Sequence, residues 1–175
     1  VPYDLQDLEK LLKEGYVDVI MSGLAISPAR LNSLAFTNPY HLVDNALLVL
    51  DSKRKLFEEY KQIRNIKGLK IAVLKNSSLD EQFSKFFPNA QKFLLNHVNE
   101  FVQKEQIDAM FWKYEQAVVF SLENPQFTTI IPKPSIGKEL YAYITHPDAK
   151  PLLNYLNDWL DILQLDETLK REKDM

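Results

Sequence analysis

The sequence contains no cysteine and only three histidines among its 175 residues. The absence of cysteine excludes disulfide bonds, thiolate metal sites and cysteine nucleophiles, and it leaves no thiol signal for a redox compartment. His41, His97 and His146 are never paired at the spacing of zinc ligands. We therefore expect neither a metal nor a cofactor.

Long apolar runs and a one-sided charge are also missing. No segment approaches the roughly 18 to 20 consecutive apolar residues of a membrane helix, and no basic-then-apolar signal stands at the N-terminus. The net charge is −3, with lysine and arginine spread along the chain. This pattern excludes a basic face for nucleic acid and a polybasic membrane anchor. We expect a soluble chain, compatible with a trimmed piece of a longer protein.

The composition is that of a folded protein. Hydrophobic residues make up 46% and charged residues 26% of the chain, enough for a buried core in one domain or two small lobes. Helix and strand patterns alternate, which predicts an α/β fold with a mostly parallel sheet. Strands are predicted at residues 17–21, 42–50, 70–74, 92–95, 109–112, 128–131 and 140–145. Helices are predicted at residues 5–12, 28–34, 53–64 (charged and exposed), 79–87, 97–105, 114–122 and from about 148.

A candidate anion site lies at residues 22–30. The pattern predicts a strand that ends in a small-residue loop, then a helix that Pro28 opens, with Arg30 in its first turn. A guanidinium offers a flat fork of donors that suits a carboxylate, especially when it is partly desolvated. The alternative is that Arg30 merely sits on a helix surface, which is the commoner situation for a single arginine.

A second candidate site is the segment 75–78, between a predicted strand and a predicted helix. Free amides at a helix N-terminus attract anions, and the hydroxyls of Ser77 and Ser78 add donors. Plain capping of the helix by Ser78 explains these residues almost as well.

Several short segments match one known family in their order and spacing: residues 11–18, 22–30, 36–40, 66–73, 106–109 and 156–160. Each matching segment is weak alone, but their order and spacing are specific. On these segments the chain, from Leu5 to about Arg171, resembles family 3 of the bacterial extracellular solute-binding proteins, which have the type II periplasmic fold of amino-acid importers.

The resemblance implies an α/β fold of two lobes, with crossing strands near residues 42–47 and 134–140. Residues 1–43 and 138–175 would form the first lobe, and residues 44–137 the second. The ligand would lie in a cleft that closes by hinge motion. Because the family's opening strand, helix and strand have no counterpart here, the first lobe is expected to be incomplete, and its exposed sheet edge would favour self-association.

The resemblance also assigns ligand contacts. Arg30 would hold the ligand carboxylate, with hydrogen bonds from the backbone of Gly23 and Ala25. Ser77 and Ser78 would close on the same carboxylate.

Lys113 departs from the family pattern, in which an acidic side chain at this position usually meets the ligand's ammonium. A lysine would repel an ammonium and attract a second carboxylate, unless Glu115 takes the acidic role. The segments 114–117, 124–128 and 131–134 resemble a branch joined to dicarboxylate or proton/glutamate symporters. The resemblance thus favours an acidic ligand, and a periplasmic or extracytoplasmic domain that is tethered to the inner membrane in a longer transporter chain.

Aromatic residues offer weaker candidates. Tyr40 and Trp112 can stack on a ligand, since small-molecule clefts have mostly apolar walls. Burial in the core is the more common role for such residues. Trp159 is predicted to be core.

Three function classes remain open. The first is a non-enzymatic binding domain that serves a membrane transporter and takes up a small amino acid or a dicarboxylate. The second is an enzyme similar to the cyclohexadienyl (prephenate/arogenate) dehydratases, for which Glu115 is the one plausible acid/base group. The third is the ligand-sensing domain of a signalling receptor.

Overall fold

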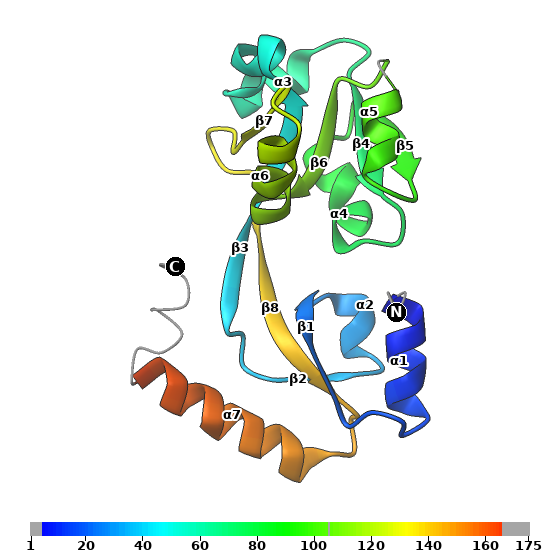
Figure 1. Ribbon diagram of the computed structural model, residues 1–175, viewed down its shortest axis with the longest axis vertical. Helices are drawn as coiled ribbons and strands as arrows, with labels where there is room; N and C mark the ends of the chain where they lie inside the picture. The colour runs from blue at the N-terminus through cyan, green and yellow to red at the C-terminus, as the bar shows by residue number, and fades with distance from the viewer. Residues whose placement is uncertain (1–4, 105, 166–175) are drawn as a thin grey trace. The chain divides into compact units, whose positions relative to one another are not determined.

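The computed structural model describes residues 5–104 and 106–165. The chain divides into two compact units: unit 1 comprises residues 1–42 and 140–175, and unit 2 comprises residues 43–139. The chain passes between the units twice, in strand β3 (His41–Leu50) and in strand β8 (Lys138–Thr145), which are cyan and orange in Figure 1.

In its described residues, unit 1 combines short strands with three helices. Strand β8 pairs antiparallel with β1 (Val19–Ala25) and with β2 (Ala35–Phe36). The helices are α1 (Leu5–Lys13), α2 (Pro28–Leu31) and α7 (Lys150–Leu165). Its core forms where leucines and isoleucines from α1, β1, β8 and the segment after α2 meet: Leu12, Ile20, Leu34 and Ile144.

Unit 2 is built around a mixed sheet. Strand β4 (Lys70–Leu74) pairs parallel with β5 (Gln91–Leu95) and β6 (Ala109–Lys113), whereas β3 pairs antiparallel with β6 and β7 (Phe127–Ile130). The helical segments are η1 (Asp51–Phe57), α3 (Tyr60–Asn65), α4 (Ser78–Phe86), α5 (Asn99–Gln103) and α6 (Tyr114–Glu123).

Strand alternation sends the side chains of β6 into two different apolar clusters. Phe111 packs in the cluster that η1, α3 and α4 complete. Met110 and Trp112 pack in the cluster that α5 and α6 complete. Because successive strand residues point to opposite faces, Lys113 lies on the Phe111 side of the sheet.

The prediction of a mostly parallel sheet is wrong. Four pairs in the described residues are antiparallel (β1–β8, β2–β8, β3–β6 and β3–β7), whereas the parallel pairs are β4–β5 and β4–β6. Parallel pairing needs a crossover between the strands, and α4 and α5 supply it only around β4. The predicted small-residue loop is also a strand in part, since β1 continues to Ala25, which pairs with Tyr141 of β8. Tertiary pairing overrides local propensity here.

The single exposed helix predicted at residues 53–64 is wrong as well. The chain forms η1, breaks at Glu59 with extended backbone (φ −111, ψ 117), and then forms α3. The break arises because the backbones of Glu59 and Lys133 pair in an isolated β-bridge. The carbonyl of Lys133 also accepts a hydrogen bond from the amide of Tyr60 at 2.9 Å. Phe57 and Ile63 are buried, so this segment contributes to the core.

Gly137, immediately before β8, lies close to the side chain of Phe86 within unit 2. Its φ is +94, and a Cβ atom there would lie 2.8 Å from Cζ of Phe86. Its carbonyl accepts the amide of Asn45 at 3.0 Å. Gly68 also has a positive φ, +69, but a Cβ there would meet no atom within 4 Å.

We expect Gly137→Ala to destabilise the protein more than Gly68→Ala. Both changes force alanine into left-handed backbone at a cost of about 1–2 kcal/mol. Only Gly137→Ala adds overpacking against Phe86, about 1–3 kcal/mol more. Urea denaturation followed by circular dichroism measures both losses. Equal losses would show that the ring of Phe86 moves aside without cost.

Candidate functional site

Arg30 is held inside unit 1. Ser27 caps α2, its Oγ accepting the Arg30 amide at 3.4 Å, and Pro28 follows in the first turn. The Arg30 side chain is only 10% exposed, and its Nε lies 3.5 Å from Oε1 of Glu9 in α1. Its Nη1 donates to the carbonyl of Ala25 at 3.0 Å. The cation therefore lies against the protein instead of extending into solvent.

The guanidinium retains binding capacity in this arrangement. It carries five N–H donors, more than its contacts with Glu9 and Ala25 use. Glu9 was not predicted from the sequence, because a glutamate in an amphipathic helix such as α1 gives no local signal that it faces an arginine. This glutamate offsets part of the charge that a ligand carboxylate would meet.

Ala25 and Gly23 are the predicted backbone contacts in unit 1. Ala25 is buried at the end of β1, and its carbonyl is the acceptor for Arg30. Gly23 belongs to β1, and the contact predicted for it lies outside what the structure describes.

Tyr40 belongs to an aromatic stack. The centroids of the Tyr40 and Tyr143 rings lie 4.6 Å apart at an interplanar angle of 28°. Tyr143 in turn stacks on Trp159 of α7, with ring centroids 6.2 Å apart. Burial, followed by the neighbouring Tyr143, raises the pKa of Tyr40. Trp159 is half-buried in this stack, whereas the sequence predicted a core residue.

In unit 2, Ser77 is the residue that caps α4. Its Oγ accepts the amide of Asp80 at 3.1 Å and donates to the carbonyl of Leu74 at 2.6 Å. Capping by Ser78, the alternative raised from the sequence, is therefore wrong: Ser78 is the first residue of the helix and is buried. Among the described hydrogen bonds, the amides of Ser78 and Leu79 have no partner, as expected at a helix N-terminus that can accept an anion.

Lys113 and the 75–78 loop lie at the same edge of the unit 2 sheet. Strands β4 and β6 are parallel neighbours, with Ile71 beside Ala109 and Ala72 beside Met110. The loop follows the carboxyl end of β4, and Lys113 is the carboxyl end of β6. Crevices at the carboxyl ends of neighbouring strands are where α/β sheets commonly bind ligands.

Lys113 has a buried counter-charge that the sequence analysis missed. Its Nζ lies 3.5 Å from Oε2 of Glu139, and the two side chains are 16% and 2% exposed. Oε1 of Glu139 accepts a hydrogen bond from Nε2 of Gln82 at 3.1 Å. Gln82 lies one turn after Ser78 on α4, so both residues share one helix face. A lysine ending a buried strand signals that a partner is needed, but not which acid provides it.

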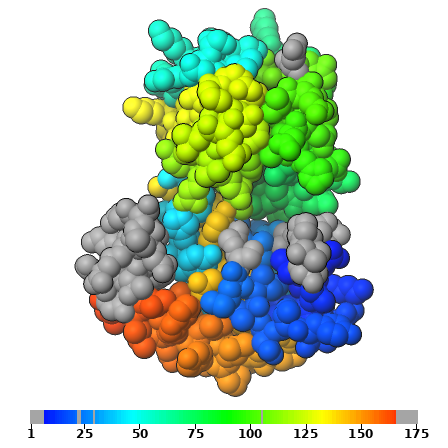
Figure 2. All heavy atoms as spheres, in the orientation of Figure 1, coloured from blue at the N-terminus to red at the C-terminus, as the bar shows by residue number. Residues whose placement is uncertain are grey.

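The structure separates Trp112 from this polar edge. Trp112 lies on the opposite face of the sheet, edge-on to Phe120 at 5.8 Å. It lines an open groove of about 440 Å³ together with the exposed Glu115 and other residues of α6: Gln116, Val119, Phe120 and Glu123. Figure 2 shows the yellow-green α6 region at the surface of unit 2.

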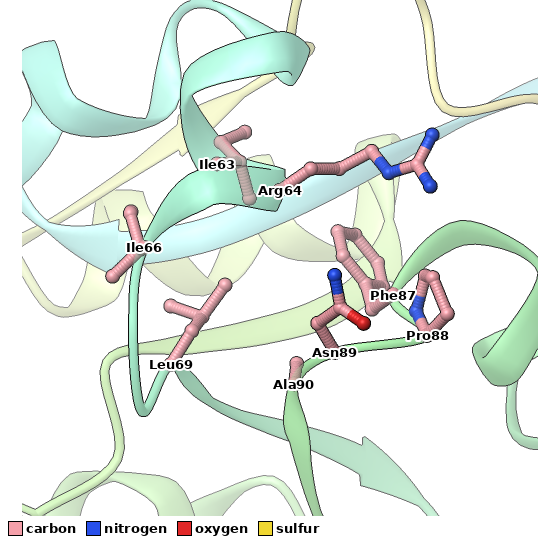
Figure 3. A pocket seen from close by; sticks show the side chains of 8 residues that line it. All are labelled: Ile63, Arg64, Ile66, Leu69, Phe87, Pro88, Asn89 and Ala90. Carbon is pink, nitrogen blue, oxygen red and sulfur yellow. The ribbon is translucent and has the colours of Figure 1, made fainter.

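A second hollow in unit 2 is too small for an amino acid. It lies between α3 and the start of β5, is lined by mostly apolar residues including Ile63, Leu69 and Phe87 (Figure 3), and offers about 10 Å³. This is room for about one water molecule.

Two further features are absent from the part of the chain that the structure describes. The described residues contain no cluster of three or more His, Cys, Asp or Glu side chains that could hold a metal ion. Nor do they contain a helix with the length and apolar character needed to cross a membrane.

Comparison with known families identifies the chain. Residues 1–174 match the family described as bacterial extracellular solute-binding proteins, family 3. The chain belongs to this family. The resemblance read from the sequence motifs is thereby confirmed, as is the α/β fold class.

Named relatives of this solute-binding chain are binding proteins. It is 27% identical to a probable histidine-binding protein of Campylobacter jejuni, over 89% of this chain and 60% of that protein. It is 25% identical to an ABC transporter arginine-binding protein of Escherichia coli, over 93% of this chain and 67% of that protein. The chain thus spans about 60 to 67% of these relatives. Both relatives are named as binding proteins.

The fold matches a solved structure of the same kind. An amino acid ABC transporter substrate-binding protein of Streptococcus pneumoniae, bound to L-arginine, superposes with a TM-score of 0.82 at 18% identity. The match covers 98% of this chain and 72% of that one. At this identity the likeness establishes the fold of the solute-binding chain.

The capping geometry makes a prediction for the two serines. We expect Ser77→Ala to lower the free energy of unfolding by about 1 kcal/mol, because the Asp80 amide loses its cap. Ser78→Ala removes no capping bond and should cost less than half as much. Urea denaturation of both variants measures the difference, and the reverse order would contradict Ser77 as the cap.

The position of Tyr40 predicts a pH dependence. Because its pKa is raised above the ordinary 10.0, the folded state keeps the proton at a pH where the unfolded chain loses it. The stabilisation is complete below the ordinary pKa and is lost as pH rises through the folded-state pKa. Tyr40→Phe should therefore reduce the loss of stability between about pH 8 and about pH 11 in urea denaturation. The control is Tyr155→Phe, at a tyrosine that is 67% exposed, and it should leave this loss unchanged.

Proposed function

We propose that the protein binds a small amino acid without chemical turnover and delivers it to a membrane importer outside the cytoplasm, with units 1 and 2 as its two lobes. The observation that carries this proposal is the nearly buried guanidinium of Arg30, held by Glu9 and Ala25 in a chain of the solute-binding family. Relatives named for binding histidine and arginine support the ligand class.

Each unit would contribute part of the carboxylate site. In unit 1, Arg30 supplies the charge, and the backbone of Gly23 and Ala25 adds hydrogen bonds. In unit 2, the N-terminus of α4 supplies the amides of Ser78 and Leu79. Since Ser77 already donates its hydroxyl proton to Leu74, its part is to hold this helix end in shape.

The ligand's other end would lie near Lys113. A dicarboxylate remains a second candidate, because an ammonium at this position attracts a carboxylate. The buried Glu139 offsets that attraction, which favours an amino acid. Links to a dicarboxylate or proton/glutamate symporter and to the inner membrane rest only on the resemblance of residues 114–117 and the segments after them. Tyr40 would act as an apolar wall of the site. Trp112 and Glu115 would not contribute, because they line the groove beside α6, on the opposite face of the sheet from Lys113 and Glu139.

A dehydratase-like activity would require a positioned acid/base group, and the candidate for it, Glu115, is exposed in the first turn of α6. A sensor role would use the same binding step, so the domains encoded beside this chain decide between transport and sensing.

A thermal-shift screen of the whole protein tests the proposed function. A ligand that binds only the folded state raises the melting temperature by mass action. The panel should contain L-histidine, L-arginine, L-glutamine, L-glutamate and succinate. Stabilisation by at least one amino acid is expected, and no response to any of them would refute amino-acid binding.

Arg30→Ala should weaken binding of the ligand found in this screen by about 2–4 kcal/mol, since the bound carboxylate loses its desolvated charged partner. Isothermal titration calorimetry measures the change. Arg54→Ala is the control, because Arg54 is 60% exposed and pairs with Glu58 on the surface of η1. A loss of less than about tenfold in affinity, equivalent to about 1.4 kcal/mol, would reject the role of Arg30.

A further inference from the structure

A buried polar cluster lies beside the carboxyl edge of the unit 2 sheet. It contains Lys113, Glu139, Gln82 and Asn45. Asn45 stands opposite Lys113 in the β3–β6 ladder, is fully buried, and donates through Nδ2 to the carbonyl of Ile136 at 3.2 Å. Such a cluster inside an apolar unit requires an explanation, because each buried polar group costs free energy unless it is paired.

Two acceptor atoms in the cluster have no hydrogen-bond partner in the part of the chain that the structure describes. They are Oδ1 of Asn45 and Oε2 of Glu139. Oε2 lies 3.5 Å from the Lys113 ammonium, an ion-pair distance without a formed hydrogen bond. The carboxylate of Glu139 is thus fixed by Gln82 on one oxygen and faces Lys113 with the other.

The exposures give the two charges different roles. The Glu139 side chain is 2% exposed and the Lys113 side chain 16% exposed, so Lys113 is the member of the pair that solvent reaches more. Glu115 is exposed, where water screens its charge, and so it is a weaker counter-charge than an acid buried beside the ammonium.

We propose that Glu139 is a specificity-determining residue that acts through Lys113: it cancels the lysine's charge, so that the site favours amino acids whose side chain carries no net charge. The inference rests on the proposed function, which places the end of the ligand opposite its bound carboxylate near Lys113. Gln82 contributes by holding the carboxylate of Glu139 in place.

The pair predicts opposite effects for its two members. Glu139→Gln removes the buried negative charge beside Lys113, so affinity for L-glutamate relative to its neutral isostere L-glutamine should rise at least about tenfold. Lys113→Met leaves the carboxylate of Glu139 uncompensated, so affinity for L-arginine relative to neutral L-citrulline should rise by a similar factor. The double variant should return both ratios to within about threefold of the starting protein, because no net charge remains.

Competition calorimetry on the whole protein with these four amino acids measures the ratios. Glu81→Gln is the matched control, since Glu81 lies on the exposed side of α4, and it should change neither ratio. A purely structural role for the pair would weaken all four ligands alike and would not produce shifts in opposite directions.

The outcomes separate this inference from the proposed function. If the starting protein binds some of the four amino acids but neither single variant changes its ratio, the specificity role of Glu139 is wrong and the proposed function stands. If the starting protein binds none of them, both are wrong. Should Glu139→Gln fail to fold by circular dichroism, Lys113→Met and the double variant decide, because the double variant buries no charge from the pair.

Discussion

A charged side chain that leaves water needs an opposite charge or several hydrogen bonds beside it, and this constraint shapes the polar sites of both units. Arg30 in unit 1 meets it through Glu9 and the carbonyl of Ala25. Lys113 in unit 2 meets it through Glu139, which Gln82 holds in turn. In each unit a cation stays nearly buried because an acid from another element neutralises it. The same pairing limits how strongly each cation can attract a ligand.

The two sites differ in what the pairing leaves available. The guanidinium of Arg30 has more donors than its partners occupy, so it can still grip a carboxylate. The ammonium of Lys113 has most of its attraction offset by a carboxylate that solvent does not reach. Within unit 1 the cation thus keeps donors for an anion, whereas within unit 2 the cation is largely matched by its own buried acid.

Much of the fold was predictable because local patterns agreed with it. Strand β4 and helices α4 and α6 lie where periodicity and Pro88 indicated. The errors occur where distant contacts decide the conformation. The pattern of residues 53–64 predicts one helix, but the backbone β-bridge between Glu59 and Lys133 interrupts that helix. Likewise, the end of β1 reads as a loop, but pairing with β8 makes it a strand.

The sequence by itself determined the family, the α/β class and the residue types of the candidate site, because these follow from the order of motifs and from local periodicity. Only the tertiary structure decided which groups oppose each other. It set Glu9 against Arg30 and Glu139 against Lys113, placed Trp112 on the other face of the sheet, and gave the cap to Ser77. The physical reason is that a counter-ion can come from any element that packs nearby, so sequence distance carries no information about it.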